Sequence, residues 1–160
     1  MNTTAQAKIL VVDDEEVVRR SFTRILETTH CHVKAVERWS EVARAMQEDP
    51  CDVVLLDLRM PEVDGMTVLR ALKQRWPESE VIIITGFPTI ESAKEAVALG
   101  AYDYLTKPVG PEQVIEASNA AMQHKRWALR AVAGAAGEQS EIRAVAVGLP
   151  NQPEFSRSES

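Results

Sequence analysis

The sequence predicts an α/β protein in which five β-strands alternate with five helices, giving a (βα)5 chain with one doubly wound, parallel sheet. Five short segments are rich in apolar and β-branched residues, and the segments between them repeat apolar residues at helical spacing. Strands that alternate with helices need crossover connections, which favour parallel pairing. The expected strands are residues 8–12, 32–36, 53–57, 81–85 and 102–106.

The strands differ in how deeply they are expected to be buried. Three of them contain the continuous apolar runs ILVV, VVLL and VIII, which are typical of strands covered on both faces. We therefore place residues 8–12, 53–57 and 81–85 in the middle of the sheet. Residues 32–36 and 102–106 mix polar and apolar side chains and are expected nearer its edges.

Residues at helical spacing predict which helix faces pack on the sheet. After the first strand they are Val17, Val18, Phe22, Ile25 and Leu26, after the third Met66, Leu69 and Leu72, and after the fifth Val114, Ile115, Ser118 and Met122. Ser40 can cap the start of the second helix, and Thr89 can cap a helix over residues 90–99. Gly100 suits a helix end, and Pro111 suits the first turn of the last helix.

Length and composition restrict the function classes. With 160 residues, 45% of them hydrophobic and 26% charged, the chain fits one domain with a packed core. A formal net charge of −6 disfavours direct binding of nucleic acid or of an anionic membrane. No apolar run approaches the roughly 20 residues that span a bilayer, and the N-terminus lacks the apolar stretch of a secretory signal. With only Cys31 and Cys51 as thiols, we expect a cytoplasmic protein.

Three acids lie where two of the central strands end. Asp13 and Asp14 follow ILVV, and Asp57 ends the next central strand. In an open parallel sheet, ligands bind beyond the carboxyl ends of the strands, so these carboxylates would converge if the strands are neighbours. Like charges so close need a cation, and oxygen ligands with room for water suit Mg²⁺. The alternative is that Asp13 and Asp14 only cap the helix that begins near Glu15.

Two further strand ends point to phosphoryl chemistry. Thr85 and Gly86 follow VIII, and Lys107 follows the fifth strand. A hydroxyl, a backbone N–H and an ammonium beside carboxylates and Mg²⁺ could neutralise the oxygens of a transferred phosphoryl group. Asp57 would be the nucleophile and would form an acyl phosphate. Because a carboxylate is already ionised near neutral pH, no catalytic histidine is required.

Four motifs in this order resemble the receiver domain of two-component response regulators. They are ILVVDDE with Asp13 and Asp14, LLDLRMPEVDG with Asp57, IIITG with Thr85, and GAYDYLTKP with Lys107. The resemblance covers about residues 6–127, which we take as the receiver domain. Residues 128–160 are expected to form an Ala-rich helix extension and a flexible C-terminal tail. In detail the sequence looks most like receivers of the nitrogen-regulatory, sigma-54 activator type.

The resemblance implies a flavodoxin-like receiver fold with strand order 2-1-3-4-5, in which Asp57 is the phosphoacceptor. It also implies a set of Mg²⁺ ligands: Asp57 itself, Asp14 directly, Asp13 through a water molecule, and the backbone carbonyl of Arg59. The chain would then be no enzyme in the usual sense, since self-phosphorylation and autodephosphorylation are stoichiometric.

The remaining site roles also follow from the resemblance. Thr85 and Lys107 would hold the phosphoryl oxygens, and the Lys107–Pro108 peptide bond would be cis, an isomer that only X-Pro bonds adopt at low cost. Arg59 and Phe87 lie two residues beyond the acceptor and the threonine, positions that tune dephosphorylation in the family. Their bulk predicts a phosphoryl group that persists longer than in fast chemotaxis-type receivers.

The resemblance also implies how a signal leaves the site. Thr85 and Tyr104 would form the switch pair, because movement of the threonine hydroxyl to the phosphoryl group vacates space for the tyrosine ring. The affected surface would comprise residues 90–99, 102–106 and 111–124. A sensor histidine kinase would supply the phosphoryl group, and a downstream protein target or a second copy of the chain would bind this surface. Neither nucleic acid nor a membrane is expected as a direct partner.

Two other functions remain open. A Mg²⁺-dependent phosphatase that forms an aspartyl phosphate could use a similar pocket, although such enzymes carry a D-x-D motif and the adjacent acids here do not match it. A binding module that works without phosphorylation is a third candidate, which the complete set of acids with Thr85 and Lys107 disfavours. The chain could also be the receiver part of a larger transcriptional regulator.

Overall fold

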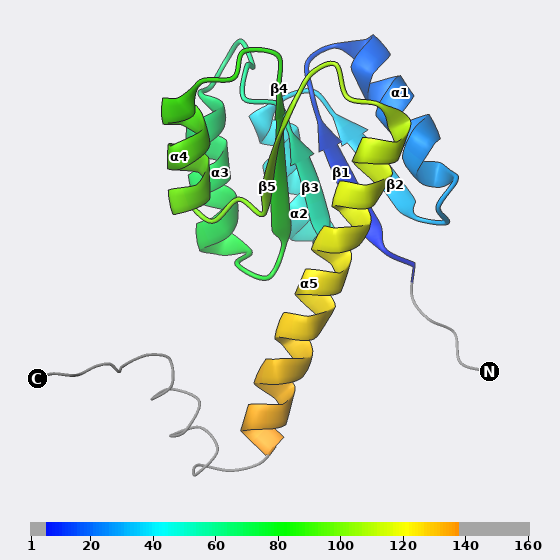
Figure 1. Ribbon diagram of the computed structural model, residues 1–160, viewed down its shortest axis with the longest axis vertical. Coiled ribbons are helices and arrows are strands. Elements are labelled where there is room, and N and C mark those ends of the chain that lie inside the picture. Colours follow the sequence, from blue (N-terminus) through cyan, green and yellow to red (C-terminus); the bar gives the residue numbers. More distant parts are fainter. Residues whose placement is uncertain (1–5, 138–160) are drawn as a thin grey trace, which may run out of the picture. The chain divides into compact units, whose positions relative to one another are not determined.

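The computed structural model describes residues 6–137 and contains five parallel strands and five helices. The strands are β1 (Lys8–Val12), β2 (His32–Val36), β3 (Val53–Leu56), β4 (Glu80–Thr85) and β5 (Asp103–Thr106). The helices are α1 (Glu16–Glu27), α2 (Trp39–Glu48), α3 (Gly65–Arg75), α4 (Ile90–Ala98) and α5 (Pro111–Gly137). The strand order is β2-β1-β3-β4-β5, which confirms the expected fold (Figure 1).

Helices cover both faces of the sheet (Figure 1). Side chains alternate between the two faces of a strand, and β1 shows the result. Leu10 and Val12 pack in a core with α2, α3 and α4, whereas Ile9 and Val11 pack in a second core with α1 and α5. The chain is therefore doubly wound, with apolar layers on both sides of the sheet.

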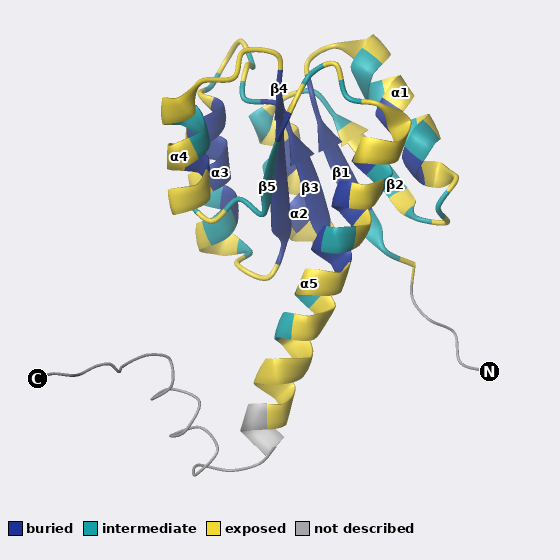
Figure 2. Cartoon of the chain, viewed as in Figure 1, coloured by how far each residue is buried: buried dark blue, intermediate teal, exposed yellow. Residues whose placement is uncertain are grey.

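The burial of the strands matches the expected positions. Every residue of β3 and β4 is buried, as are four of the five residues of β1 (Figure 2). The edge strands β2 and β5 are less buried because each has a neighbouring strand on one side only. Continuous apolar sequence thus corresponds to the three central strands, as predicted.

Two details of the helices differ from the expectation. Val17 is 79% exposed, whereas Phe22 and Leu26 of the same helix are buried. Each residue turns an α-helix by about 100°, which leaves Val17 outside the arc shared by the other apolar residues of α1. Ser40 is not an N-cap, because α2 begins one residue earlier, at Trp39, and its cap residue makes no side-chain hydrogen bond.

The chain divides into two units by its internal contacts, one ending at Lys125 and the other beginning at Arg126. The first unit holds the sheet and α5 as far as Lys125. In the second, α5 continues to Gly137, and Trp127, Leu129 and Val132 are exposed. The flexible tail expected near the C-terminus lies outside the described residues. Within residues 6–137, no helix has the length and apolar character needed to cross a membrane.

Candidate functional site

The strand pairing brings the expected acids together at the carboxyl end of the sheet. β1 and β3 are neighbours, with Val12 opposite Leu56, so the next residues on the two strands are Asp13 and Asp57. The Asp57 N–H donates to the carbonyl of Val12 at 3.0 Å, which extends the ladder to the site. Both acids are nearly buried, with 2% and 5% of the residue surface exposed.

Asp14 joins these two residues in one cluster of carboxylates. One oxygen from each of Asp13, Asp14 and Asp57 lies within 4.8 Å of the others. Asp13 also accepts the N–H of Glu15 at 2.9 Å, which shapes the turn that leads into α1. The residue at the N-cap position of α1 is Glu15, so neither Asp13 nor Asp14 occupies that position.

Lys107 reaches this cluster from the loop that follows β5. Its Nζ lies 2.8 Å from Oδ2 of Asp13 and 3.4 Å from Oδ2 of Asp57. The backbone N–H of Lys107 donates to the carbonyl of Thr85 at 2.8 Å, so the loop is held to the end of β4. The Lys107–Pro108 peptide bond is cis. The ammonium thus contacts acids that follow two different strands.

Burial and charge act together on this cluster. Burial raises the pKa of Asp57, and the charge of Asp13 raises it further, whereas the Arg59 N–H and Lys107 oppose the shift. Burial opposes the charged form of Lys107, but its hydrogen bonds and charge contacts with Asp13 and Asp57 outweigh this, so its pKa is raised. The three clustered carboxylates are accompanied by one ammonium, which contacts two of them, and the excess negative charge is one that a divalent cation would balance.

Arg59 and Phe87 stand at the mouth of the site. The guanidinium carbon of Arg59 lies 4.0 Å from the centre of the Phe87 ring, a cation–π contact. Both residues line a cavity of about 500 Å³ together with Asp57 and Lys107. The Arg59 N–H also donates to Oδ1 of Asp57 at 3.1 Å, which fixes the orientation of that carboxylate.

The expected switch residues do not contact the carboxylates through any hydrogen bond among the described residues. Thr85 is fully buried, and its hydroxyl accepts the N–H of Phe87 at 3.1 Å. Tyr104 is half-buried, and its hydroxyl hydrogen-bonds with Ser92 of α4. The structure therefore groups Asp13, Asp14, Asp57 and Lys107 directly, with Arg59 and Phe87 beside them.

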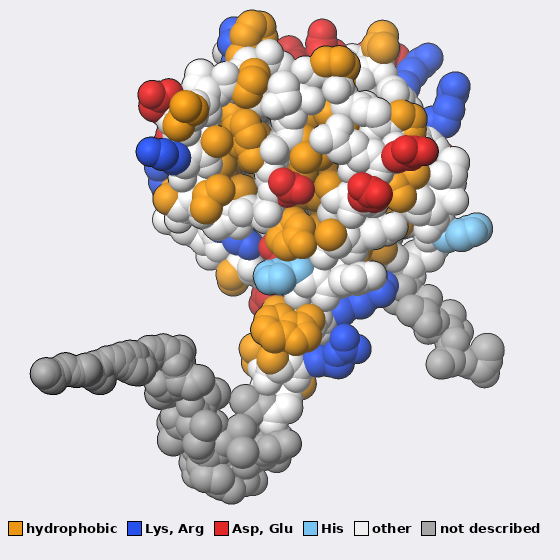
Figure 3. Space-filling model, in the orientation of Figure 1, with side chains coloured by type: hydrophobic (Ala, Val, Ile, Leu, Met, Phe, Trp, Pro, Cys, Tyr) orange, Lys and Arg blue, Asp and Glu red, His pale blue; other side chains and the backbone are white. Residues whose placement is uncertain are grey.

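The expected partner surface comprises α4, β5 and the start of α5. Figure 3 shows hydrophobic side chains gathered over the α4 side of the molecule, with acidic side chains on the same face. Ile90 and Val97 of α4 are 73% and 66% exposed. An exposed apolar surface of this kind is typical of a protein-binding site.

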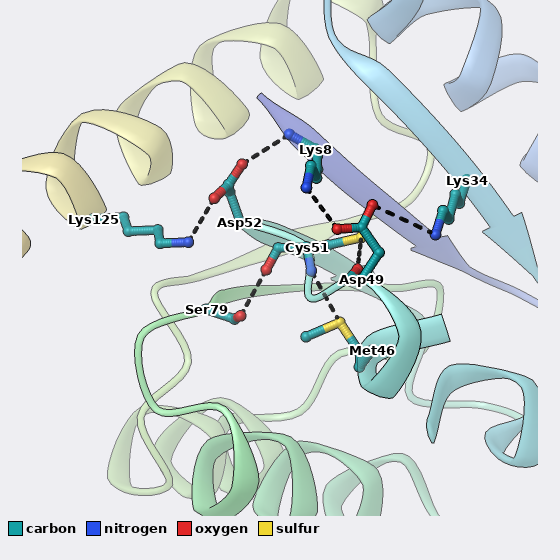
Figure 4. Close-up of polar contacts among 8 residues, drawn as sticks. All are labelled: Lys8, Lys34, Met46, Asp49, Cys51, Asp52, Ser79 and Lys125. Carbon is teal, nitrogen blue, oxygen red and sulfur yellow. Dashed lines mark hydrogen bonds and ion pairs between the residues drawn. The ribbon is translucent and has the colours of Figure 1, made fainter. Parts of the chain in front are cut away.

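Sequence reasoning missed a polar network at the opposite end of the sheet. There Asp52 accepts the backbone N–H of Lys8 at 2.8 Å and pairs with Lys125 of α5 (Figure 4). Near it, Oε2 of Glu80 and Nδ1 of His124 form a hydrogen bond of 2.6 Å. These pairs join residues more than forty positions apart, so local sequence patterns carry no signal for them.

Comparisons with known proteins identify the family of the chain. The family model described as "Response regulator receiver domain" matches residues 9–119. An NtrX-like response regulator from Rickettsia felis is 35% identical over 113 residues, which are 69% of this chain and 24% of that protein. The DNA-binding transcriptional regulator NtrC from Proteus hauseri is 31% identical over 121 residues, or 76% of this chain and 26% of that protein.

A solved structure, NtrX from Brucella abortus, superposes with a TM-score of 0.75 at 28% identity and covers 80% of this chain and 30% of that one. The chain spans about a quarter of the length of the curated relatives that it matches. These relatives support the expected nitrogen-regulatory type. The chain belongs to the response regulator receiver domain family of two-component signalling proteins.

Proposed function

We propose that the chain accepts a phosphoryl group from a sensor histidine kinase on the carboxylate of Asp57. The observation that carries the proposal is the cluster of Asp13, Asp14 and Asp57 with Lys107 in contact with two of these acids. The cluster offers a nucleophile, oxygen ligands for a divalent cation, and an ammonium for the phosphoryl oxygens. The ammonium, together with a cation held by these ligands, would supply the positive charge that phosphoryl transfer needs.

In the proposed step, an Asp57 carboxylate oxygen attacks phosphorus in line with the leaving group. The P–N bond of a phosphohistidine breaks, and the imidazole nitrogen leaves with the electron pair and later takes a proton. The product is an acyl phosphate on Asp57. Lys107 would bind a phosphoryl oxygen, and Arg59 already orients the acceptor through its N–H. Thr85 would turn its hydroxyl from the Phe87 N–H to the phosphoryl group.

The donor set fits Mg²⁺. Carboxylate oxygens from Asp13, Asp14 and Asp57 lie close enough to share one ion, and Asp14 is exposed, so water can complete the ligands. The backbone carbonyl of Arg59 is the further ligand that the family resemblance implies. When bound, the ion would neutralise charge on the transferred group. Asp13 and Asp57 would exchange part of their contact with Lys107 for it.

The proposal extends to the partners of the chain. Turning of Tyr104 would change the surface of α4, β5 and the start of α5, to which a downstream protein or a second copy of the chain would bind. The Proteus hauseri relative is named a DNA-binding regulator, whereas we expect residues 6–127 of this chain to make no direct contact with nucleic acid. A cytoplasmic location remains a prediction from the sequence.

A small phosphodonor tests the chemistry. Wild type, Asp57→Asn and Asp64→Asn are incubated with acetyl phosphate and Mg²⁺, and intact mass is recorded. We expect one phosphoryl group on the wild type and on Asp64→Asn, whose altered acid is exposed, and none on Asp57→Asn. Labelling that survives Asp57→Asn contradicts the assignment.

A second assay on the same proteins separates the receiver from the phosphatase alternative. A receiver consumes about one donor for each acyl phosphate that forms and later hydrolyses, and it does not turn over a general phosphate ester. Sustained release of nitrophenol from nitrophenyl phosphate, lost in Asp57→Asn, would favour the phosphatase. We propose the stoichiometric behaviour because the adjacent acids of this chain do not form the D-x-D motif of those enzymes.

A further inference from the structure

The hydroxyl of Tyr104 connects β5 to the start of α4. It forms a hydrogen bond with Oγ of Ser92, which lies in the first turn of the helix. The Tyr104 ring packs against the apolar core shared by α2, α3 and α4. Tyr104 is thus held at both ends, by apolar contacts along the ring and by one polar contact at its tip.

Ser92 also closes the N-terminal cap of α4. The Thr89 hydroxyl accepts the Ser92 N–H at 2.9 Å, and the Ser92 hydroxyl accepts the Thr89 N–H at 3.3 Å, a reciprocal capping box. The Ser92 hydroxyl also donates to the Thr89 carbonyl at 3.1 Å. Thr89 was the expected cap, whereas its partner Ser92 was not foreseen.

The Ser92 hydroxyl lies within hydrogen-bonding distance of three groups. A serine hydroxyl has one proton and two acceptor positions, so it can serve all three. Two of the groups are the carbonyl and the N–H of Thr89. The third is the Tyr104 hydroxyl, and either oxygen of this pair can be the donor. With all three contacts made, the Ser92 hydroxyl is satisfied.

The bond to Ser92 holds Tyr104 on α4 while Thr85 is also in a fixed position. β4 and β5 pair with Ile83 opposite Tyr104 and Thr85 opposite Thr106. Tyr104 and Thr85 are thus diagonal neighbours on one face of the sheet. In the structure, the hydroxyl of Thr85 accepts the N–H of Phe87, and the hydroxyl of Tyr104 shares a hydrogen bond with that of Ser92. The hydroxyls of Thr85 and Tyr104 are therefore hydrogen-bonded to other residues and not to each other.

We propose that Ser92 is a positioning residue that holds Tyr104 in the conformation of the phosphate-free chain. The inference rests on the proposed phosphorylation of Asp57. If the ring turns toward the place that Thr85 vacates, the Tyr104–Ser92 bond is lost, but the two Thr89 contacts that cap α4 remain. Ser92 therefore opposes the phosphorylated conformation, and any ligand that favours this conformation must overcome the bond.

Affinity for beryllofluoride, a phosphoryl mimic, measures this opposition. Wild type, Ser92→Ala, Tyr104→Phe and the double variant are titrated with beryllofluoride in Mg²⁺ by calorimetry. One net hydrogen bond corresponds to about a two- to tenfold change in an equilibrium. We expect each single variant to bind the mimic more tightly by that factor. The double variant should gain no more than a single one, because both substitutions remove the same bond.

Thr89→Ala is the matched control. It removes the other half of the capping box and leaves the Ser92–Tyr104 bond. We expect faster hydrogen exchange in the first turn of α4 and a beryllofluoride affinity within about twofold of wild type. An equal gain in Thr89→Ala and Ser92→Ala would mean that the cap alone opposes the change, which overturns the inference. Additive gains in the double variant, or no gain in either single variant, also overturn it.

A second readout separates this inference from the proposed function. If the wild type does not bind beryllofluoride, phosphorylation of Asp57 fails as a proposal. The position of Tyr104 is then read from the aromatic NMR signals of the free protein. Ser92→Ala should shift the ring signals of Tyr104 and leave those of Tyr102, and Thr89→Ala should shift neither. Unchanged Tyr104 signals in Ser92→Ala contradict the holding role in the free chain as well.

Discussion

Lys107 and Asp13 form an ion pair of 2.8 Å between Nζ and Oδ2, although 94 positions separate them in the sequence. The Asp13 side chain is only 3% exposed, so bulk solvent screens this ion pair weakly. Without Lys107, Asp13 and Asp57 would be buried as neighbouring charges with no cation. The ion pair therefore supports the fold as well as the proposed chemistry.

Lys107→Met should lower the free energy of unfolding in EDTA by about 1–3 kcal/mol, the usual cost of losing a hydrogen bond between charged groups. Urea denaturation followed by circular dichroism measures the change. Lys94→Met, at an exposed position on α4, should change it by less than about 0.5 kcal/mol. Equal stability of the two variants would show that Lys107 makes no contribution to folding.

Magnesium should stabilise the chain through the carboxylate cluster. A ligand that binds only the folded state adds about 1.4 kcal/mol at ten times its dissociation constant. Asp14→Asn removes one proposed ligand and keeps the contacts of Lys107 with Asp13 and Asp57. We expect Mg²⁺ to raise the Tm of the wild type more than that of Asp14→Asn. In EDTA the variant should be at least as stable, because one repulsive charge is gone.

Glu78→Gln provides the control for the magnesium experiment. Glu78 is an exposed acid in the connection between α3 and β4, so its substitution changes the net charge equally without touching the cluster. This variant should keep the full Mg²⁺ shift in Tm. If all three proteins gain the same stability from Mg²⁺, the ion binds elsewhere or without selectivity.

The contact between Arg59 and Phe87 should slow the loss of a phosphoryl group from Asp57. Phe87 is 64% exposed, so the ring and the guanidinium form a partial cover over the cavity. An exposed cation–π contact is worth about 0.5–1 kcal/mol, or roughly a two- to fivefold change in rate. We expect Arg59→Ala and Phe87→Ala to release phosphate faster by about this factor, measured on the purified phosphoprotein.

The double variant and a surface control test whether the pair acts as a unit. If the two residues act as a unit, the rate increase of the double variant should be smaller than the product of the two single-variant increases. Val97→Ala, at an exposed apolar position on α4, should leave the rate unchanged. A slower release from Phe87→Ala would mean that the ring assists the attacking water and does not exclude it.

The sequence was sufficient for the parts of the molecule that depend on local pattern and on sheet geometry. Continuous apolar runs located β1, β3 and β4, and the rule that parallel strands end at one edge located Asp13 and Asp57. Both inferences need only the order of residues along each strand and the identity of neighbouring strands.

The contacts that were missed depend on how distant elements pack. The tip of Tyr104 meets Ser92 only because α4 lies beside β5, and His124 meets Glu80 only because α5 crosses the start of β4. The exposure of Val17, by contrast, follows from the turn of about 100° per residue, which places it outside the arc of the other apolar residues of α1. Periodicity therefore gives the apolar face of a helix, and packing decides which distant residues this face meets.

Gly65 begins α3 at a position where no side chain fits. A Cβ there would lie 2.5 Å from Cα of Leu58 and 2.6 Å from its carbonyl oxygen, both backbone atoms that cannot turn aside. The Gly65 N–H also donates to that carbonyl at 3.2 Å. Gly65→Ala should therefore displace the loop that carries Arg59 and cost about 1–3 kcal/mol of stability.

Gly110→Ala is the matched control, because nothing lies within 4 Å of a Cβ at that position. Its stability should equal or slightly exceed that of the wild type, since alanine restricts the unfolded chain. Thermal denaturation of both variants measures the difference. A Gly65→Ala protein that is as stable as Gly110→Ala would show that the loop after β3 can yield at no cost.

Asp52 should be the main polar anchor at the far end of the sheet. It accepts the Lys8 N–H at 2.8 Å and pairs with Lys125, whose side chain is 15% exposed (Figure 4). Asp52→Ala leaves both donors without this partner, and we expect a loss of about 1–3 kcal/mol in urea denaturation. Hydrogen exchange should also become faster in α5 just before Lys125, because one contact that holds the helix to β3 is gone.

Asp49→Ala is the variant to compare with Asp52→Ala, and the pH dependence of its stability tests the ion pair of Asp49. Asp49 pairs with Lys8, but its side chain is 39% exposed, so its loss should cost less than that of Asp52. The hydrogen bond from Lys8 holds the pKa of Asp49 below its ordinary value of 3.8. Its contribution is therefore complete above that pH and disappears as the pH falls through the lower folded-state pKa. The Tm difference between wild type and Asp49→Ala should shrink toward zero over this acidic range, and a difference that grows there would contradict the assignment of the Lys8 pair.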